Sequence, residues 1–353
     1  MSNYNMSNSD NMTGIINIYK EKDYTSHDVV AIVRKLLSNV AKKDNSKKGK
    51  IKVGHTGTLD PQAEGVLPIC VGRATKLADY LTNGTELSAP DKSYRAELIL
   101  GMTTDTDDHT GKILTGGSID SNYNIDERAR SLSESKISLA GIPLARMPLT
   151  RIEEAVLSFV GGYMQTPPMY SAIKIDGKKL YDLARAGKTV ERKPRHVDIS
   201  RIAIVDINLE NNRLWLEVDC SKGTYIRSLC ADIGQKLGCG GCMGDLIRTK
   251  SGTFCLENSI RLSELKLAVE ENSWDFLISV DKALPVPKGT LVNFFTQAIN
   301  GRSVPYEHVS FTNTAPMSEG QLCWLYEKEN LIGLYSFKKG TLRLEVMMYD
   351  NHR

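Results

Sequence analysis

Hydrophobic and polar positions repeat along this chain with two different periods, which predict a mixture of strands and helices. Residues 14–19 form a short apolar run with the character of a strand. Thr25 or Ser26 can cap a helix after it, because a small hydroxyl side chain accepts hydrogen bonds from free backbone N–H groups. The apolar residues that follow share one helical face: Val29, Val30, Val33, Leu36, Leu37 and Val40. The chain is therefore predicted to open with a strand and an amphipathic helix.

Alternation of apolar and polar residues predicts strands at 94–100 and 214–220. Asn211 and Asn212 are typical of a turn, so a strand at 202–207 is predicted to pair antiparallel with the one that follows it. Helices are predicted at 226–237, at 262–271 and after a capping-box pattern formed by Thr150 and Glu153. Strands and helices mix without a regular strand–helix–strand rhythm. We therefore predict an α/β fold of the α+β type, with a mixed, largely antiparallel sheet flanked by helices.

Changes in composition divide the chain into three parts. Residues 1–13 are rich in Ser and Asn and are predicted to form a disordered polar tail. Residues 14–284 form the predicted main domain, interrupted near 115–148 by a Gly-, Ser- and Asn-containing insertion with a short helix at 125–139. A break at 285–289 with two prolines precedes residues 290–353, whose short strands end in an alternating run. A small C-terminal β-rich domain is predicted there.

Bulk composition excludes several classes of protein. A chain of 353 residues with 41% hydrophobic positions can bury a sizeable core. It has no apolar run of about eighteen residues and no signal-peptide pattern, so a soluble, cytoplasmic protein without membrane contact is predicted. Its seven scattered cysteines favour reduced thiols. Cys239 and Cys242 have metal-ligand spacing, but no second pair of Cys or His residues matches them, so no metal site is predicted.

The distribution of charge is more informative than its total. A net charge of +3 does not by itself indicate nucleic-acid binding. The stretch 42–52 holds six Lys and one Asp, and the stretch 174–195 holds eight basic and three acidic residues. Such runs can contact phosphates. Taken alone, they are more often solvated loops or helix faces.

The densest local motif is Gly-His-Thr-Gly-Thr-Leu-Asp-Pro at 54–61. Pro61 disfavours a helical conformation at Asp60, and the two glycines permit tight backbone turns, so Asp60 is predicted to lie on a rigid loop. A carboxylate held in this way can attack or stabilise an electrophilic carbon. From spacing alone, an Asp that merely caps a turn is the better reading of this motif.

His55 lies in the same motif and can serve as a base. No nucleophilic Ser or Cys pattern accompanies it, so a hydrogen-bonding or RNA-contacting role is favoured. The glycines at 54 and 57 lack the Lys-Ser/Thr ending of a phosphate-binding loop, and no paired Gly-rich dinucleotide motif follows a strand. No nucleotide cofactor is therefore predicted.

Several separated motifs together resemble the bacterial tRNA pseudouridine-55 synthases, known as the TruB family. Their shared order is more specific than any one motif. They span most of residues 14–255 and lie at 54–61, 92–95, 167–174, 177–181, 221–227 and 246–248. The chain departs from the family at 20–23, where Lys-Glu-Lys-Asp replaces Lys-Pro-x-Gly. The turn that Pro and Gly would shape is therefore expected to form differently.

The resemblance implies that Asp60 is the catalytic aspartate and that Arg227 lies beside it as its charge partner. A guanidinium next to the carboxylate would keep Asp60 ionised in a pocket that otherwise excludes water. The resemblance does not decide whether Asp60 attacks C1′, attacks C6 or acts through a glycal.

The resemblance also implies a binding pocket around Asp60. Tyr94 would stack on the target base and assist proton movement at carbon 5, while Tyr225 and Leu246 would complete the pocket walls. His55 would contact the RNA near the flipped nucleotide. Without the resemblance, Tyr94 and Leu246 are ordinary core residues.

The activity implied is conversion of uridine 55 in the T arm of tRNA to pseudouridine, by a monomer that needs no cofactor and no protein partner. The base must be flipped out of a folded loop, at a cost of roughly a few kcal/mol that stacking and phosphate contacts offset. The small C-terminal domain is predicted to be a PUA-like RNA-binding domain. The side chains expected to bind the phosphates of the T-arm backbone are Lys174, Lys178, Lys179 and Arg185.

Two other functions are kept as alternatives. The protein can be an RNA-binding or tRNA-folding factor whose binding module is the C-terminal domain. It can also be a relative that works within a guide-RNA complex, although it lacks the long basic extensions expected of that class. The Asp60, Tyr94 and Arg227 set favours catalysis, because a factor that only binds RNA has no need of the carboxylate.

Overall fold

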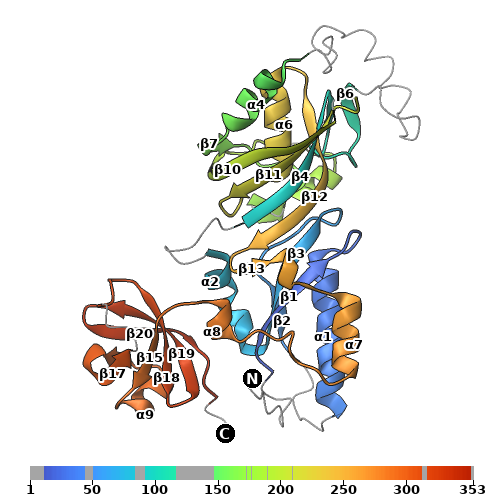
Figure 1. Cartoon of the computed structure of the whole chain (residues 1–353). Coiled ribbons are helices and arrows are strands. Elements are labelled where there is room, and N and C mark those ends of the chain that lie inside the picture. The colour runs from blue at the N-terminus through green and yellow to red at the C-terminus, as the bar shows by residue number, and fades with distance from the viewer. Residues whose placement is uncertain are drawn as a thin grey trace.

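A computed structural model describes residues 12–43, 51–83, 92–116, 147–171, 173–175, 177–188, 190–208, 210–311 and 316–350. For residues 174, 175, 178, 179 and 185 it describes the backbone and not the side chain. The described residues form a long, twisted sheet of ten strands and a separate C-terminal sheet of six strands (Figure 1).

The long sheet is mixed and mostly antiparallel. Its strand order is β14-β1-β3-β12-β4-β11-β10-β7, with β2 joined to β3 and β13 joined to β12. Of the described strand pairs in this sheet, β1–β14 and β3–β12 are parallel and the others antiparallel. The strands are β1 (Gly14–Lys20), β2 (Val53–His55), β3 (Glu64–Val71), β4 (Lys92–Leu100), β7 (Gly161–Gln165), β10 (Arg195–Asn208), β11 (Arg213–Cys220), β12 (Gly241–Ser251), β13 (Phe254–Cys255) and β14 (Ile260–Arg261). The predicted fold class is confirmed.

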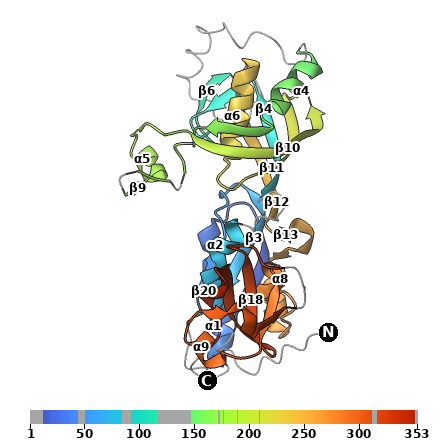
Figure 2. The same cartoon turned by 90° about the vertical axis from the view of Figure 1, so that its left-hand side faces the viewer.

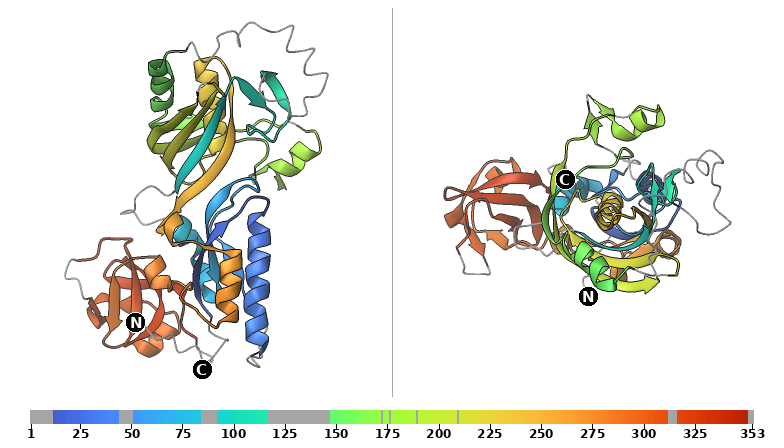
Figure 3. Two further views of the ribbon diagram at one scale, coloured as in Figure 1. Left: turned by 45° about the vertical axis from the view of Figure 1, so that its right-hand side comes forward. Right: turned by 90° about the horizontal axis from the view of Figure 1, so that it is seen from above.

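Helices α1 (Ser26–Lys43) and α7 (Leu262–Glu270) lie side by side against the half of the sheet formed by β1, β2 and β3 (Figure 3). The predicted apolar face of α1 is confirmed, because Val29, Val33 and Leu37 are fully buried in this core. Their burial against the sheet supplies the hydrophobic free energy that fixes α1 there.

Helices α4 (Leu149–Leu157) and α6 (Ile226–Leu237) pack on the other half of the sheet, around β4, β10, β11 and β12. The bounds of α6 match the prediction. The capping box predicted for α4 is wrong, because Pro148 is the N-cap and no side chain there makes a capping hydrogen bond. Thr150 already lies inside the first turn, so its hydroxyl is not at the capping position.

The C-terminal sheet has its own core. Its strand order is β16-β20-β19-β18-β15-β17. Tyr335 is fully buried between this sheet and helix α9, where its hydroxyl donates to the Ala298 carbonyl at 3.2 Å. The elements are β15 (Lys288–Leu291), α9 (Phe295–Ile299), β16 (Val304–Pro305), η5 (Tyr306–His308), β17 (Val309–Phe311), β18 (Leu322–Glu327), β19 (Asn330–Lys338) and β20 (Thr341–Met347).

The C-terminal sheet packs on the long sheet through an apolar core and polar contacts. Fully buried Trp324 joins residues of β1 and β3 in this core, and its indole N–H donates to the Leu284 carbonyl at 2.8 Å. Arg73 donates to the Met348 carbonyl at 2.7 Å and pairs with Asp350 at 2.8 Å. These contacts hold the two sheets together. The elements beside this contact are η2 (Gly72–Leu77), α2 (Ala78–Asn83), η4 (Leu256–Asn258) and α8 (Val280–Ala283).

Two small hairpins complete the structure. Strands β5 (Met102–Thr104) and β6 (Ile113–Gly116) follow β4, while β8 (Lys174–Ile175), β9 (Lys178–Lys179) and helix α5 (Leu180–Arg185) lie to one side of the long sheet (Figure 2). The helix predicted at 125–139 falls outside the described residues, as do residues 1–11 of the predicted tail and 44–50 of the lysine-rich stretch. Met12, at the end of that tail, is buried in the core beneath α1.

Candidate active site

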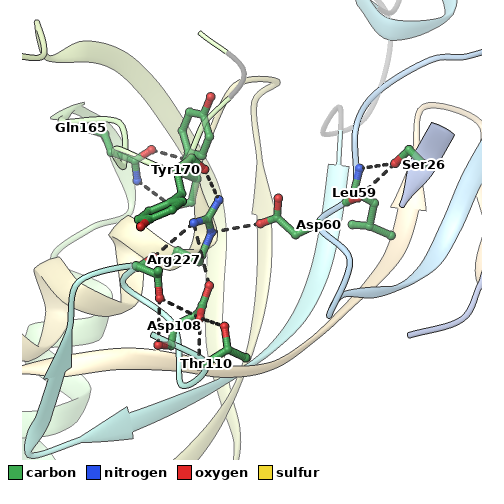
Figure 4. Close-up of polar contacts among 10 residues, drawn as sticks. Ser26, Leu59, Asp60, Asp108, Thr110, Gln165, Tyr170 and Arg227 are labelled. Carbon is green, nitrogen blue, oxygen red and sulfur yellow. Dashed lines mark hydrogen bonds and ion pairs between the residues drawn. The ribbon is translucent and has the colours of Figure 1, made fainter. Parts of the chain in front are cut away.

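The centre of the site is an ion pair between Asp60 and Arg227. Asp60 lies in the connection from β2 to β3, and Arg227 is the second residue of α6. The Nε of Arg227 lies 3.0 Å from Oδ2 of Asp60 (Figure 4). The Arg227 side chain is only 6% exposed, whereas that of Asp60 is 43% exposed. Arg227 therefore binds the Asp60 carboxylate on the side that faces the protein, and the opposite side of the carboxylate is open to a ligand.

Arg227 makes further contacts that fix its guanidinium. Nη1 donates to the Thr106 carbonyl at 3.2 Å, and Nη2 donates to the Tyr170 carbonyl at 2.8 Å. Asp108 lies 3.9 Å from Nη1, and the hydroxyl of Thr110 donates to its other oxygen at 2.6 Å. Sequence reasoning missed Asp108. The polar run at 103–110 was the available signal, but it is equally typical of a turn.

The loop that carries Asp60 is held by side chains from other elements. Ser26 Oγ, at the start of α1, accepts from the Leu59 N–H at 2.9 Å and lies 3.1 Å from the Leu59 carbonyl. Arg248 on β12 is fully buried and donates to the carbonyls of Gly57 and Thr58, both at 3.3 Å. The rigid loop predicted for Asp60 is thus present. Its rigidity comes from distant side chains as well as from Pro61.

Lys20, the last residue of β1, also contacts the loop that carries Asp60. Its Nζ donates to the carbonyls of Pro61 at 3.0 Å, Tyr24 at 2.8 Å and Glu21 at 3.0 Å. Burial lowers the pKa of Lys20 to about 8. Asp23 takes the family's Gly position with a positive φ of 69°, which Asp tolerates better than most residues. The turn therefore forms without the Pro and Gly of the family pattern, and sequence reasoning gave Lys20 no role.

We expect Lys20→Met to slow the conversion that the family resemblance implies by roughly tenfold to a hundredfold, because it frees the Pro61 carbonyl and lets the Asp60 loop move. The measurement is the single-turnover rate, at saturating enzyme, on the RNA that the resemblance implies as substrate. Lys22→Met is the matched control, since Lys22 is two residues away and pairs on the surface with Asp245. Equal rates for the two variants would show that the Lys20 contacts do not hold the loop in its active position.

His55 and Tyr94 both lie close to the Asp60 loop. His55 ends β2, and burial lowers the pKa of its imidazole, with nearby His27, Arg248 and Lys92 acting in the same direction. The ring is therefore neutral near pH 7. Burial raises the pKa of Tyr94 to about 12, so its phenol keeps its proton there. Any proton that Tyr94 moves must come from a neutral phenol.

Two of the remaining predicted pocket residues, Tyr94 and Leu246, lie close to each other in the core. Tyr94 on β4 is paired in register with Arg248 on β12, and Leu246 is paired with Ala96. Tyr94 and Leu246 are buried in the same core cluster as Leu59, the residue before Asp60. Tyr225 immediately precedes α6 and is partly exposed. The two buried residues belong to the core, and the predicted pocket formed by the three stays a prediction.

The four residues predicted to contact the RNA backbone lie on the hairpin of β8 and β9 and on α5. Lys174 and Lys179 are paired across β8 and β9, and Arg185 ends α5. Their side chains, and that of Lys178, lie outside the described residues. Their predicted contact with RNA therefore stays a prediction.

The His, Cys, Asp and Glu side chains of the described residues do not gather into a metal site. No group of three or more among them is placed to hold a metal ion. All seven cysteines, including Cys239 and Cys242, are free thiols. No described helix is long and apolar enough to cross a bilayer.

A further carboxylate, Asp232, lies on α6, the helix that carries Arg227. Its Oδ2 accepts from the Tyr163 hydroxyl at 3.3 Å, and burial raises the pKa of Asp232 to about 6. The folded protein therefore keeps a proton on Asp232 between pH 4 and 6 that the unfolded chain has lost, since the ordinary value is 3.8. Stability from this group is present at low pH and is lost as pH rises through about 6.

We expect Asp232→Asn to raise the free energy of unfolding at pH 8 by about 1 kcal/mol, after allowance for the partial exposure of the side chain. The gain should shrink steadily between about pH 6 and pH 4, because wild-type Asp232 then becomes neutral too. Urea unfolding across this range measures the effect. A gain that is the same at pH 5 and pH 8 would contradict the assignment to the buried charge.

Solved structures share this fold. A structure of an H/ACA ribonucleoprotein bound to a substrate RNA containing 2′-deoxyuridine matches 97% of this chain and 87% of its own, with a TM-score of 0.64 and 22% identity. A Cbf5-Nop10-Gar1 complex matches 97% of this chain and 86% of its own, with a TM-score of 0.62 and also 22% identity. The likeness to these structures is one of fold.

Sequence comparison then identifies the family. The model of the TruB family pseudouridylate synthase N-terminal domain matches residues 42–136 and 128–226, and that of the tRNA pseudouridylate synthase B C-terminal domain matches 227–284. The tRNA pseudouridine synthase B of Alkaliphilus oremlandii is 44% identical over 90% of this chain and 91% of its own, and that of Listeria welshimeri is 37% identical over 90% and 93%. The chain belongs to the TruB family of pseudouridine synthases.

Proposed function

We propose that this protein converts the uridine at position 55, in the T arm of tRNA, to pseudouridine. The observation that carries the proposal is the Asp60–Arg227 pair, in which a buried guanidinium holds a half-exposed carboxylate at 3.0 Å. The relatives in Alkaliphilus and Listeria are named tRNA pseudouridine synthase B, which supports tRNA as the substrate. A factor that only bound or folded RNA would gain nothing from such a pair.

The reaction needs no group beyond those of the protein. The N1–C1′ bond of the nucleotide breaks, the uracil turns, and a C5–C1′ bond forms, while the proton on C5 is exchanged for one on N1. The numbers of atoms and electrons do not change, so neither a redox cofactor nor an energy source is required. Asp60 is the group that assists cleavage of the glycosidic bond. Tyr94 is proposed to relay the C5 proton: its phenol oxygen accepts that proton while its own proton passes to water, and N1 takes a proton from water.

The substrate base is proposed to leave its stack and enter the site beside Asp60. Tyr94 provides a stacking surface, Tyr225 and Leu246 form the walls, and neutral His55 contacts the RNA near the flipped nucleotide. Lys174, Lys178, Lys179 and Arg185 are proposed to contact the T-arm backbone, which would make affinity depend on salt. The partial exposure of Asp60 supports access of a base from one side.

The proposal also covers the domains of the chain, its oligomeric state and its location. Residues 14–284 are the catalytic domain, and residues 290–353 are a PUA-like RNA-binding domain whose position is set by its packing on the long sheet. The protein acts as a monomer in the cytoplasm, without a protein partner. The support for the monomer is that Asp60, Arg227 and the residues that hold them all come from one chain, so the site is complete without a second subunit.

The test is turnover on an isolated T-arm hairpin, with pseudouridine mapped by position. We expect complete conversion at uridine 55 without any guide RNA or added protein, and none in a hairpin with cytidine at that position. Binding without conversion would favour an RNA-binding or tRNA-folding factor. Conversion only when a guide RNA is added would favour the guide-dependent class.

A further inference from the structure

Gln165, the last residue of β7, makes two hydrogen bonds to the backbone of Tyr225. Its Oε1 accepts from the Tyr225 N–H at 2.8 Å, and its Nε2 donates to the Tyr225 carbonyl at 3.0 Å. The side chain is buried, with only 1% of the residue exposed. Both polar ends of one buried amide therefore bind a single residue of the proposed pocket.

Tyr225 is also the residue at which α6 begins. It is the N-cap of the helix and makes no capping hydrogen bond with its own side chain. Its carbonyl accepts the backbone N–H of Leu229 at 3.0 Å, which is the first bond of the helix. Gln165 binds the same carbonyl, so it anchors the first turn of α6 to β7. Arg227 lies in that turn, two residues further on, and Figure 4 shows it between Gln165 and Asp60.

The amide of Gln165 is itself held in one orientation. Its Nε2 donates to the Tyr163 hydroxyl oxygen at 2.5 Å, and that hydroxyl donates to Oδ2 of Asp232 at 3.3 Å. Because the phenol gives its only proton to the carboxylate, it can only accept from Gln165. These two bonds turn the NH₂ end of Gln165 toward Tyr163 and leave its carbonyl for the Tyr225 N–H. Asp232 also lies on α6, so β7 holds the helix at two points.

We propose that Gln165 is a positioning residue for pseudouridine formation, which sets the place of Arg227 beside Asp60 by fixing the backbone of Tyr225. The proposal rests on the function proposed above. Gln165 does not touch the reacting atoms, since Tyr225 and Arg227 stand between it and Asp60. Its loss should therefore affect the rate of the chemical step more than the affinity for RNA.

The test compares Gln165→Leu with wild type on the T-arm hairpin. We expect the single-turnover rate to fall by about a hundredfold, as a small displacement of a catalytic group can produce, while the dissociation constant for RNA changes by less than about twofold. Gln235→Leu is the matched control, since Gln235 lies on the exposed face of the same helix. A rate within about threefold of wild type, or an equal loss in rate and affinity, overturns the proposal.

Gln165→Glu gives an independent readout if the Leu variant does not fold. The ionised carboxylate of this variant cannot donate to the Tyr225 carbonyl, whereas its protonated form can. We therefore expect the ratio of its rate to that of wild type to rise several-fold as pH falls from about 8 to about 6. The ratio corrects for titration of Asp232, which occurs in both proteins. Tyr163, the other titratable group of this hydrogen-bonded set, keeps its proton throughout because burial raises the pKa of its phenol. A flat ratio overturns the proposal. If wild type forms no pseudouridine at position 55, the proposed function fails instead.

Discussion

Asp60→Asn will bind tRNA with an affinity within about threefold of wild type and will form no measurable pseudouridine, a loss of at least about ten-thousandfold in rate. The amide is nearly the same size as the carboxylate and can still contact Arg227. It has no negative charge with which to attack or stabilise an electron-poor carbon. Binding is retained because the RNA is held mainly by contacts outside the reacting carbon. Single-turnover assays and filter binding on the same hairpin measure the two effects.

The matched control for this variant is Asp245→Asn. The Asp245 side chain has the same 43% exposure as that of Asp60 and also forms an ion pair, with Lys22 at 2.8 Å. We expect it to keep the wild-type rate, because its loss removes a surface ion pair of small energy. Full activity of Asp60→Asn would reject Asp60 as the catalytic group and leave the chemistry without a candidate on this loop.

Arg227→Met will lower the single-turnover rate by about a thousandfold or more, because one change removes the partner of Asp60 and the donors to the Thr106 and Tyr170 carbonyls. It leaves Asp60 and Asp108 without their shared cation. Arg227→Lys restores the charge but not the planar set of donors, so we expect it to recover only part of the loss. The measurement is the rate at saturating enzyme for each variant.

Arg213→Met is the control for the loss of a partly buried arginine. Arg213 is the first residue of β11, opposite Ile99 near the end of β4, and it pairs with Glu97 at 2.8 Å. We expect Arg213→Met to lower stability and leave the rate of the chemical step unchanged at temperatures where it is folded. If both arginine variants lost the same activity, the effect of Arg227 would be one of stability and not of catalysis.

Much of the fold could be predicted from local patterns. Helix α6 has the predicted bounds, α7 ends one residue earlier than predicted, and β10 and β11 pair antiparallel as the turn between them indicated. Their periodicity is strong because each buries one face in a common core. The predicted start of α4 was wrong, because the capping box formed by Thr150 and Glu153 is not used and the N-cap is Pro148. Where a helix begins depends on which nearby group caps it, and the pattern alone does not decide that.

Within the site, local pattern and family motifs pointed to Asp60, Arg227, Tyr94, Tyr225 and Leu246. They gave no role in holding the site to Lys20, Ser26, Asp108, Gln165 and Arg248. Most of these act through backbone carbonyls or N–H groups of a distant segment. Backbone groups are the same in almost every residue, so no sequence signal marks which of them a side chain will bind.

By itself, the sequence determined which chemical groups the protein has and which segments become strands or helices, because side-chain chemistry and local periodicity depend only on residues near one another. Only the tertiary structure decided that Arg227 stands 3.0 Å from Asp60 and that Gln165 anchors the first turn of α6. Those contacts join segments far apart along the chain. They form where the packing of helices on a twisted sheet brings them together, and that packing is a property of the whole core.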